Sequence, residues 1–124
     1  MSVRSNNDFP GIVVGVGATI SQNSGDQVNS YGLGVKAFVN VTAIGTGSIT
    51  VTIQGKDPTS GVYYTVLASA AIVGNGLVVL SVYPALTATA NLVANDVLPR
   101  VWRVLVTANN ANPASYTVGA SVIV

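Results

Sequence analysis

Side chains that could carry chemistry are few in this sequence. Among its 124 residues are four aspartates and five lysines or arginines, with no histidine, glutamate or cysteine. Acid–base catalysis near neutral pH usually uses histidine or a carboxylate with a shifted pKa. Asp8, Asp26, Asp57 and Asp96 each lie in a polar or turn-like segment, and their spacing gives no sign of the facing pair that a glycosidase needs. We therefore predict that the protein is not an enzyme.

Other kinds of reactive site are equally poorly supported. The serine and threonine hydroxyls have no histidine to activate them, and the only lysines are Lys36, expected to point outward from a strand, and Lys56, beside a turn. Four dispersed aspartates make a poor calcium or magnesium cage. Residues 15–20 begin like a dinucleotide fingerprint, but the third glycine and the following helix are missing. We expect no metal and no cofactor.

Charge content is the most unusual property of the chain. Only 7% of residues are charged and the net charge is +1, whereas about a quarter of an ordinary soluble domain is charged. The net charge is too small to attract nucleic acid or an acidic membrane. Surface charges help to keep proteins apart, so a surface with so few of them associates easily with other proteins. This favours burial against protein partners. A soluble, monomeric β-domain is the alternative.

A membrane span is rejected although residues 58–95 contain no charged side chain. The most apolar part, residues 66–86, is interrupted by Gly74, Asn75 and Gly76 and ends near Pro84. A spanning helix needs about 20 predominantly apolar residues, so two strands joined by a tight turn explain the pattern better. The first ten residues lack the apolar stretch of a secretory signal.

Alternating side chains predict strands. In residues 48–54, Ile49, Val51 and Ile53 fall on one face and polar residues on the other, which is the period of a half-buried strand. No segment shows the helical period of 3.6. We predict seven strands, at residues 11–20, 33–44, 48–54, 62–69, 77–83, 101–108 and 116–124.

Turn residues separate these strands. We predict a hairpin at residues 45–47, a compact reversal at 56–61, and further turns at 74–76 and 109–113. Residues 21–30 and 85–100 are irregular; the second is long enough to cross between sheets, with a short helical turn at 88–94. The predicted fold is an all-β, two-sheet sandwich of about seven strands, immunoglobulin-like or jelly-roll-like. Residues 11–124 form the single domain, and residues 1–10 an extended N-terminal arm.

Aromatic residues are expected to serve mainly in packing. Trp102 shares its strand face with two valines, which suits a core residue, while Tyr63 and Tyr64 fall on opposite faces of one strand. A carbohydrate-binding platform would need exposed aromatic rings, for which the candidates are Tyr31, Tyr63 and Tyr83.

Several strand-and-turn runs resemble small structural proteins of tailed bacteriophages and prophages. The clearest is residues 48–58, Ser-Ile-Thr-Val-Thr-Ile-Gln-Gly-Lys-Asp-Pro. The resemblance spans about residues 34–124, and its motifs specify a lineage better than a task. The other runs that carry it are residues 39–43, 61–69, 82–87, 95–104 and 115–121.

This resemblance implies a virion component, best fitted by a head decoration (cement) protein. Such a protein is made in the host cytoplasm, binds the major capsid protein on the outside of the assembled head, often as a trimer, and clasps its neighbours with an extended arm. The candidate interface residues are Arg4, Phe9, Ile12 and Tyr31. The alternatives are a tail or connector protein, or a module that binds carbohydrate or a cell surface.

Overall fold

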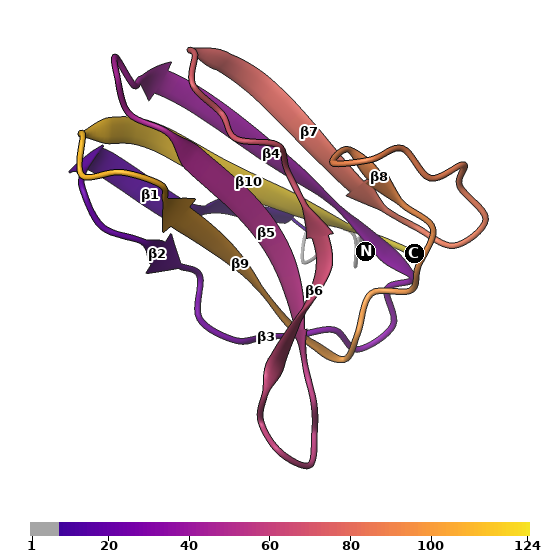
Figure 1. The fold of residues 1–124 in the computed structure, drawn as a ribbon. Helices are drawn as coiled ribbons and strands as arrows, with labels where there is room; N and C mark the ends of the chain where they lie inside the picture. The colour runs from indigo at the N-terminus through magenta and orange to yellow at the C-terminus, as the bar shows by residue number, and fades with distance from the viewer. Residues whose placement is uncertain (1–7) are drawn as a thin grey trace.

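A computed structural model describes residues 8–124, and all regular structure there is β. Two sheets pack against each other (Figure 1), which confirms the predicted sandwich. The strands are β1 (Asp8–Ala18), β2 (Gln22–Asn23), β3 (Gln27–Val28), β4 (Gly34–Ala43), β5 (Ile49–Lys56), β6 (Tyr63–Ala68), β7 (Gly76–Val82), β8 (Val93–Ala94), β9 (Val101–Ala108) and β10 (Ala114–Ile123).

Strand order distinguishes the two sandwich topologies that the sequence left open. The first sheet has the order β1-β10-β4-β7-β8; the second has β2-β9-β5-β6, with β3 also pairing with β9. We count β2 and β3 as one interrupted strand, leave out the short β8 and renumber the remaining eight strands in chain order. The two sheets then have the strand orders 1-8-3-6 and 2-7-4-5. This double Greek key is a jelly roll. In an immunoglobulin-like sandwich the last strand would pair with the strand before it, but β10 lies between β1 and β4.

All seven predicted strands occur, with ends that differ by a few residues. The two-residue strands β2, β3 and β8 lie in the segments predicted to be irregular, because so short a pairing leaves no alternation to read. Residues 85–100 do cross from one sheet to the other, as predicted. The predicted helical turn at 88–94 is wrong: Thr89 and Val93 exchange two backbone hydrogen bonds in a tight reversal.

The predicted hairpin at residues 45–47 is wrong, because this segment links β4 to β5, which belong to different sheets. The turn predicted at residues 74–76 lies at the start of β7, and the link from β6 to β7 also passes between sheets. Residues 109–113 also cross between sheets. Only the reversal at 56–61 joins antiparallel partners, β5 and β6. The alternation of apolar and polar side chains shows which face of a strand is buried. It does not show whether the next strand belongs to the same sheet or to the other one.

The predicted arm, residues 1–10, overlaps a strand. Residues 1–7 lie outside the described residues, but β1 already begins at Asp8, and Phe9 pairs with Ala120. Pro10 is tolerated because β1 is an edge strand, where a missing N–H costs no ladder bond. A register shift between Phe9 and Val13 accommodates Gly11, whose φ is +59°.

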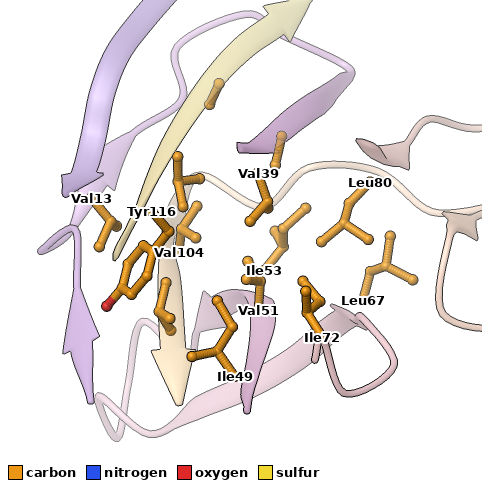
Figure 2. Packing of buried hydrophobic residues seen from close by; sticks show 14 of the residues in the cluster. Val13, Val39, Ile49, Val51, Ile53, Leu67, Ile72, Leu80, Val104 and Tyr116 are labelled. Atoms are coloured by element: carbon orange, nitrogen blue, oxygen red, sulfur yellow. The ribbon is translucent and has the colours of Figure 1, made fainter. Parts of the chain in front are cut away.

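The core lies between the sheets and consists mainly of valine and isoleucine (Figure 2). Ile49, Val51 and Ile53 of β5 point inward, as their alternation predicts. Trp102 is fully buried with the inward valines of β9, which confirms its predicted role. Tyr116 of β10 lies beside Val13 in the core, and burial raises the pKa of its phenol.

Candidate interaction surface

A groove lies where the start of β1, the end of β10 and the β3–β4 link meet. Its volume is about 280 Å³. Tyr31, 63% exposed, stands on the link, whereas Phe9 is half-buried. The lining residues, called the end groove below, are Phe9, Val28, Asn29, Ser30, Tyr31, Gly32 and Val122.

Asn29 fixes the turn that presents Tyr31. Its side-chain Oδ1 accepts a hydrogen bond from the Gly32 N–H (2.8 Å), and its Nδ2 donates to the carbonyls of Gly32 (2.8 Å) and Leu98 (3.1 Å). The Asn29 N–H donates to the Arg100 carbonyl at 2.6 Å. Tyr31 is therefore displayed on a turn that is tied to the segment leading into β9.

Gly32 allows the turn to pack closely on β10. A Cβ atom at this position would lie 2.1 Å from Cγ1 of Val122 and 2.8 Å from Oδ1 of Asn29. A larger residue would push the turn away from Val122 or break the Asn29 bond. The shape of the end groove thus depends on a glycine.

Phe9 connects the end groove to the core. Its ring meets that of Trp102 edge to face, with centroids 5.7 Å apart and an interplanar angle of 79°, a favourable aromatic geometry. The buried Nε1 of Trp102 has no hydrogen-bond partner among residues 8–124. The Phe9–Trp102 pair therefore connects the exposed end groove with the hydrophobic core.

The four candidate interface residues have different positions. The structure brings Phe9 and Tyr31 together in the end groove. Ile12 is half-buried and packs against the core from β1, and Arg4 lies outside the described residues. Sequence reasoning missed the five other groove residues: Val28, Asn29, Ser30, Gly32 and Val122. The spacing of Asn29 and Gly32 is a turn signal that could have been read, but nothing local links it to Val122.

A polar cluster occupies the outer face of the second sheet. The ammonium of Lys56 on β5 binds the Asp26 carboxylate at 2.8 Å, and the Tyr63 hydroxyl on β6 donates to the same carboxylate. The guanidinium of Arg103 on β9 lies over the Tyr63 ring, 3.5 Å from its centroid, and its Nε donates to Gln54 at 2.7 Å. These five residues, the Asp26 cluster, tie the β2–β3 segment to β5, β6 and β9.

Hydrogen bonding sets the ionisation of the cluster. The bonds from Lys56 and then Tyr63 hold the pKa of the Asp26 carboxyl below its ordinary value. The same bond to Asp26 raises the pKa of the Lys56 ammonium. Both shifts favour the charged pair, so the cluster is built to stay ionised. Every polar group named here already has a partner within the cluster, which suits a structural clip better than a reactive site.

Comparison of the chain with family profiles, curated proteins and solved structures finds no match. The function must therefore be inferred from the surface features described above.

The three tyrosines considered for carbohydrate binding do not form one platform. Tyr31 lies in the end groove, Tyr63 belongs to the Asp26 cluster, and Tyr83 lines a separate hollow beside Lys36. Tyr64 instead lines a further hollow, of about 440 Å³. That hollow is lined by Lys56, Asp57, Pro58, Tyr64, Pro99, Arg100 and Val101.

No cluster of catalytic or metal-binding side chains is evident in the part of the chain that the structure describes. Within residues 8–124, no three His, Cys, Asp or Glu side chains group together to hold a metal ion. The Asp57 carboxylate accepts hydrogen bonds from the Thr59 N–H and the Ser60 hydroxyl, which lower its pKa and confirm its predicted turn role. The described residues also contain no helix of the length and hydropathy needed to cross a membrane.

Proposed function

We propose that this protein is a structural component of a tailed-bacteriophage particle, and that it decorates the outer surface of the assembled head. One observation carries the proposal: across residues 8–124, fifteen large apolar side chains are at least about a third exposed, against only eight charged residues. A surface with so few charges offers little electrostatic resistance to association, which favours burial of its apolar side chains against partners.

Fold and sequence add support. Jelly rolls are a recurrent architecture of viral capsid domains, although a fold alone does not decide a function. The resemblance of residues 34–124 to phage structural proteins points to the same class of protein. Carbohydrate-binding domains share the jelly-roll architecture, so an experiment must distinguish head decoration from carbohydrate binding.

The proposed mechanism is selective binding. A protein that binds the assembled, expanded shell but not the free capsid protein stabilises the shell by mass action. Repetition on the capsid lattice multiplies that effect. We assign the capsid contact to the end groove, because the hydrogen bonds of Asn29 fix the backbone of the turn that carries Tyr31, and this backbone therefore loses little conformational freedom on binding.

The test is electron microscopy of particles that lack this protein, before and after the purified protein is added back. We expect protrusions on the head that vanish with the gene and return on addition. Tyr31→Ala should weaken rebinding by about tenfold or more, as for an exposed aromatic anchor. Val62→Ala, which alters an equally exposed residue beyond the β5–β6 reversal, should rebind normally.

Other outcomes would reject the proposal in distinct ways. Protein located on the tail or connector would make it a different virion part. Protein absent from the particle, together with binding to isolated host glycans, would favour the carbohydrate alternative. Equal rebinding of Tyr31→Ala and Val62→Ala to heads would remove the end groove from the contact while leaving decoration intact.

A further inference from the structure

The outer face of the first sheet carries two opposite charges in one row. Ser121 on β10 pairs with Asp8 of β1 on one side and with Lys36 of β4 on the other. Paired residues point to the same face of a sheet, and neighbouring strands lie about 4.8 Å apart. Asp8 and Lys36 therefore stand about 10 Å apart, one on each side of β10.

Both charges are available to a partner. Asp8 and Lys36 are exposed, and the Ser121 hydroxyl donates to Oδ1 of Asp8 at 2.7 Å, which orients the carboxylate. Within residues 8–124, Lys36 forms no ion pair. No other charged residue lies on β1, β10, β4 or β7 in the described chain, so the face is neutral overall.

The next row of this face is apolar. Phe38 on β4 pairs with Gly119 on β10 and is 36% exposed. On the other side of Gly119 lies the irregular part of β1 that contains Gly11. A Cβ atom on Gly11 would lie 3.5 Å from Cγ2 of Val14, an exposed residue. Pro10, Gly11 and Val14 of β1 are all exposed beside this row.

We propose that this face binds a second copy of the chain about a two-fold axis that runs along β10. Such an axis exchanges the positions of β1 and β4, so that each Lys36 faces the partner copy's acidic position at residue 8, and each Phe38 faces the exposed segment at residues 10–11 of the partner copy. The face is self-complementary in charge, as an isologous interface requires. Aligned sheets are also a normal way for β-faces to pack.

The small side chains of β10 permit this approach. Its outward residues are Ser115, Thr117, Gly119 and Ser121, since their strand neighbours alternate into the core. Three shared strands of about seven residues cover roughly 14 by 20 Å, or about 300 Å² per copy, which is well below the area of a standard specific interface. The dimer is therefore expected to be weak and to need high protein concentration or a lattice that holds copies together.

The test is sedimentation of the purified protein over a wide concentration range, with no phage particle present. We expect a monomer–dimer equilibrium. Lys36→Asp and Asp8→Lys should each weaken dimerisation by about tenfold or more, because each places like charges opposite one another at both symmetric contacts. The double variant with both substitutions should recover most of the affinity, since it restores opposite charges.

Two controls separate this pairing from other causes. Phe38→Asp should abolish the dimer, whereas Val73→Asp, on an exposed loop outside this face, should leave it unchanged. A monomer at every concentration, or a double variant no better than the single ones, would overturn the inference. No capsid is present in this measurement. The protein can therefore prove to be a monomer and still decorate the head, or form the dimer without decorating the head.

Discussion

Gly34, at the start of β4, has no room for a side chain. A Cβ atom there would lie 2.0 Å from the carbonyl oxygen of Val82 and 3.0 Å from Cα of Tyr83. These are backbone atoms of the neighbouring strand region, so they cannot move aside as a side-chain end can. Gly34→Ala should lower the free energy of unfolding by about 1–3 kcal/mol or more, as overpacking does.

Urea unfolding followed by the fluorescence of Trp102 measures this effect. Gly74→Ala is the matched control, because a Cβ at residue 74 meets no atom within 4 Å. It should leave the free energy of unfolding within about 0.5 kcal/mol of the parent value, as for most surface changes. Equal destabilisation by the two variants would show that loss of glycine flexibility, and not the clash, dominates.

At the scale of elements, the Asp26 cluster holds the β2–β3 segment against β9, β5 and β6. The pKa of Asp26 lies below its ordinary value of 3.8 in the folded protein. The ionised carboxylate therefore stabilises the fold above that value, and this contribution is lost as pH falls through the folded pKa. Lys56→Met should raise the Asp26 pKa toward its ordinary value, because the Lys56 hydrogen bond is its largest cause.

Titration of the Asp26 carboxyl by carbon NMR reads this shift directly. Lys36→Met removes a lysine that has no ion-pair partner within residues 8–124, and it should leave the Asp26 pKa unchanged. Amide exchange at Ser24, whose N–H bonds the Val104 carbonyl, should also quicken in Lys56→Met. An unshifted carboxyl with unchanged exchange would mean that Lys56 does not hold the segment.

At the scale of the whole molecule, the connections predict one cooperative unit. The links β4–β5, β6–β7 and β9–β10 all pass between sheets, so neither sheet can separate without disrupting the other. Trp102 is the only tryptophan and is fully buried between the sheets. Its fluorescence and the far-ultraviolet circular dichroism should change at the same urea concentration, as two-state unfolding requires. A dichroism change at lower urea would indicate that an outer strand unfolds first.

The sequence alone was sufficient for the fold class and for the inward faces of the long strands. Side chains alternate with period two whatever a strand's neighbours are, so Ile49, Val51, Ile53 and Trp102 could be assigned to the core from local pattern. The scarcity of charge likewise followed from composition. Asp57 in its turn was predictable because its hydrogen bonds reach only two or three residues along the chain.

Only the tertiary structure decided which strands pair and which surface residues meet. Local alternation is the same for a hairpin and for a link that crosses to the other sheet, so residues 45–47 were misassigned. The end groove joins Phe9, Tyr31 and Val122, and the outer face of the first sheet brings Asp8 and Lys36 to the two sides of β10. Such contacts depend on strand order, which is set by packing across the whole domain and leaves no trace in short-range spacing.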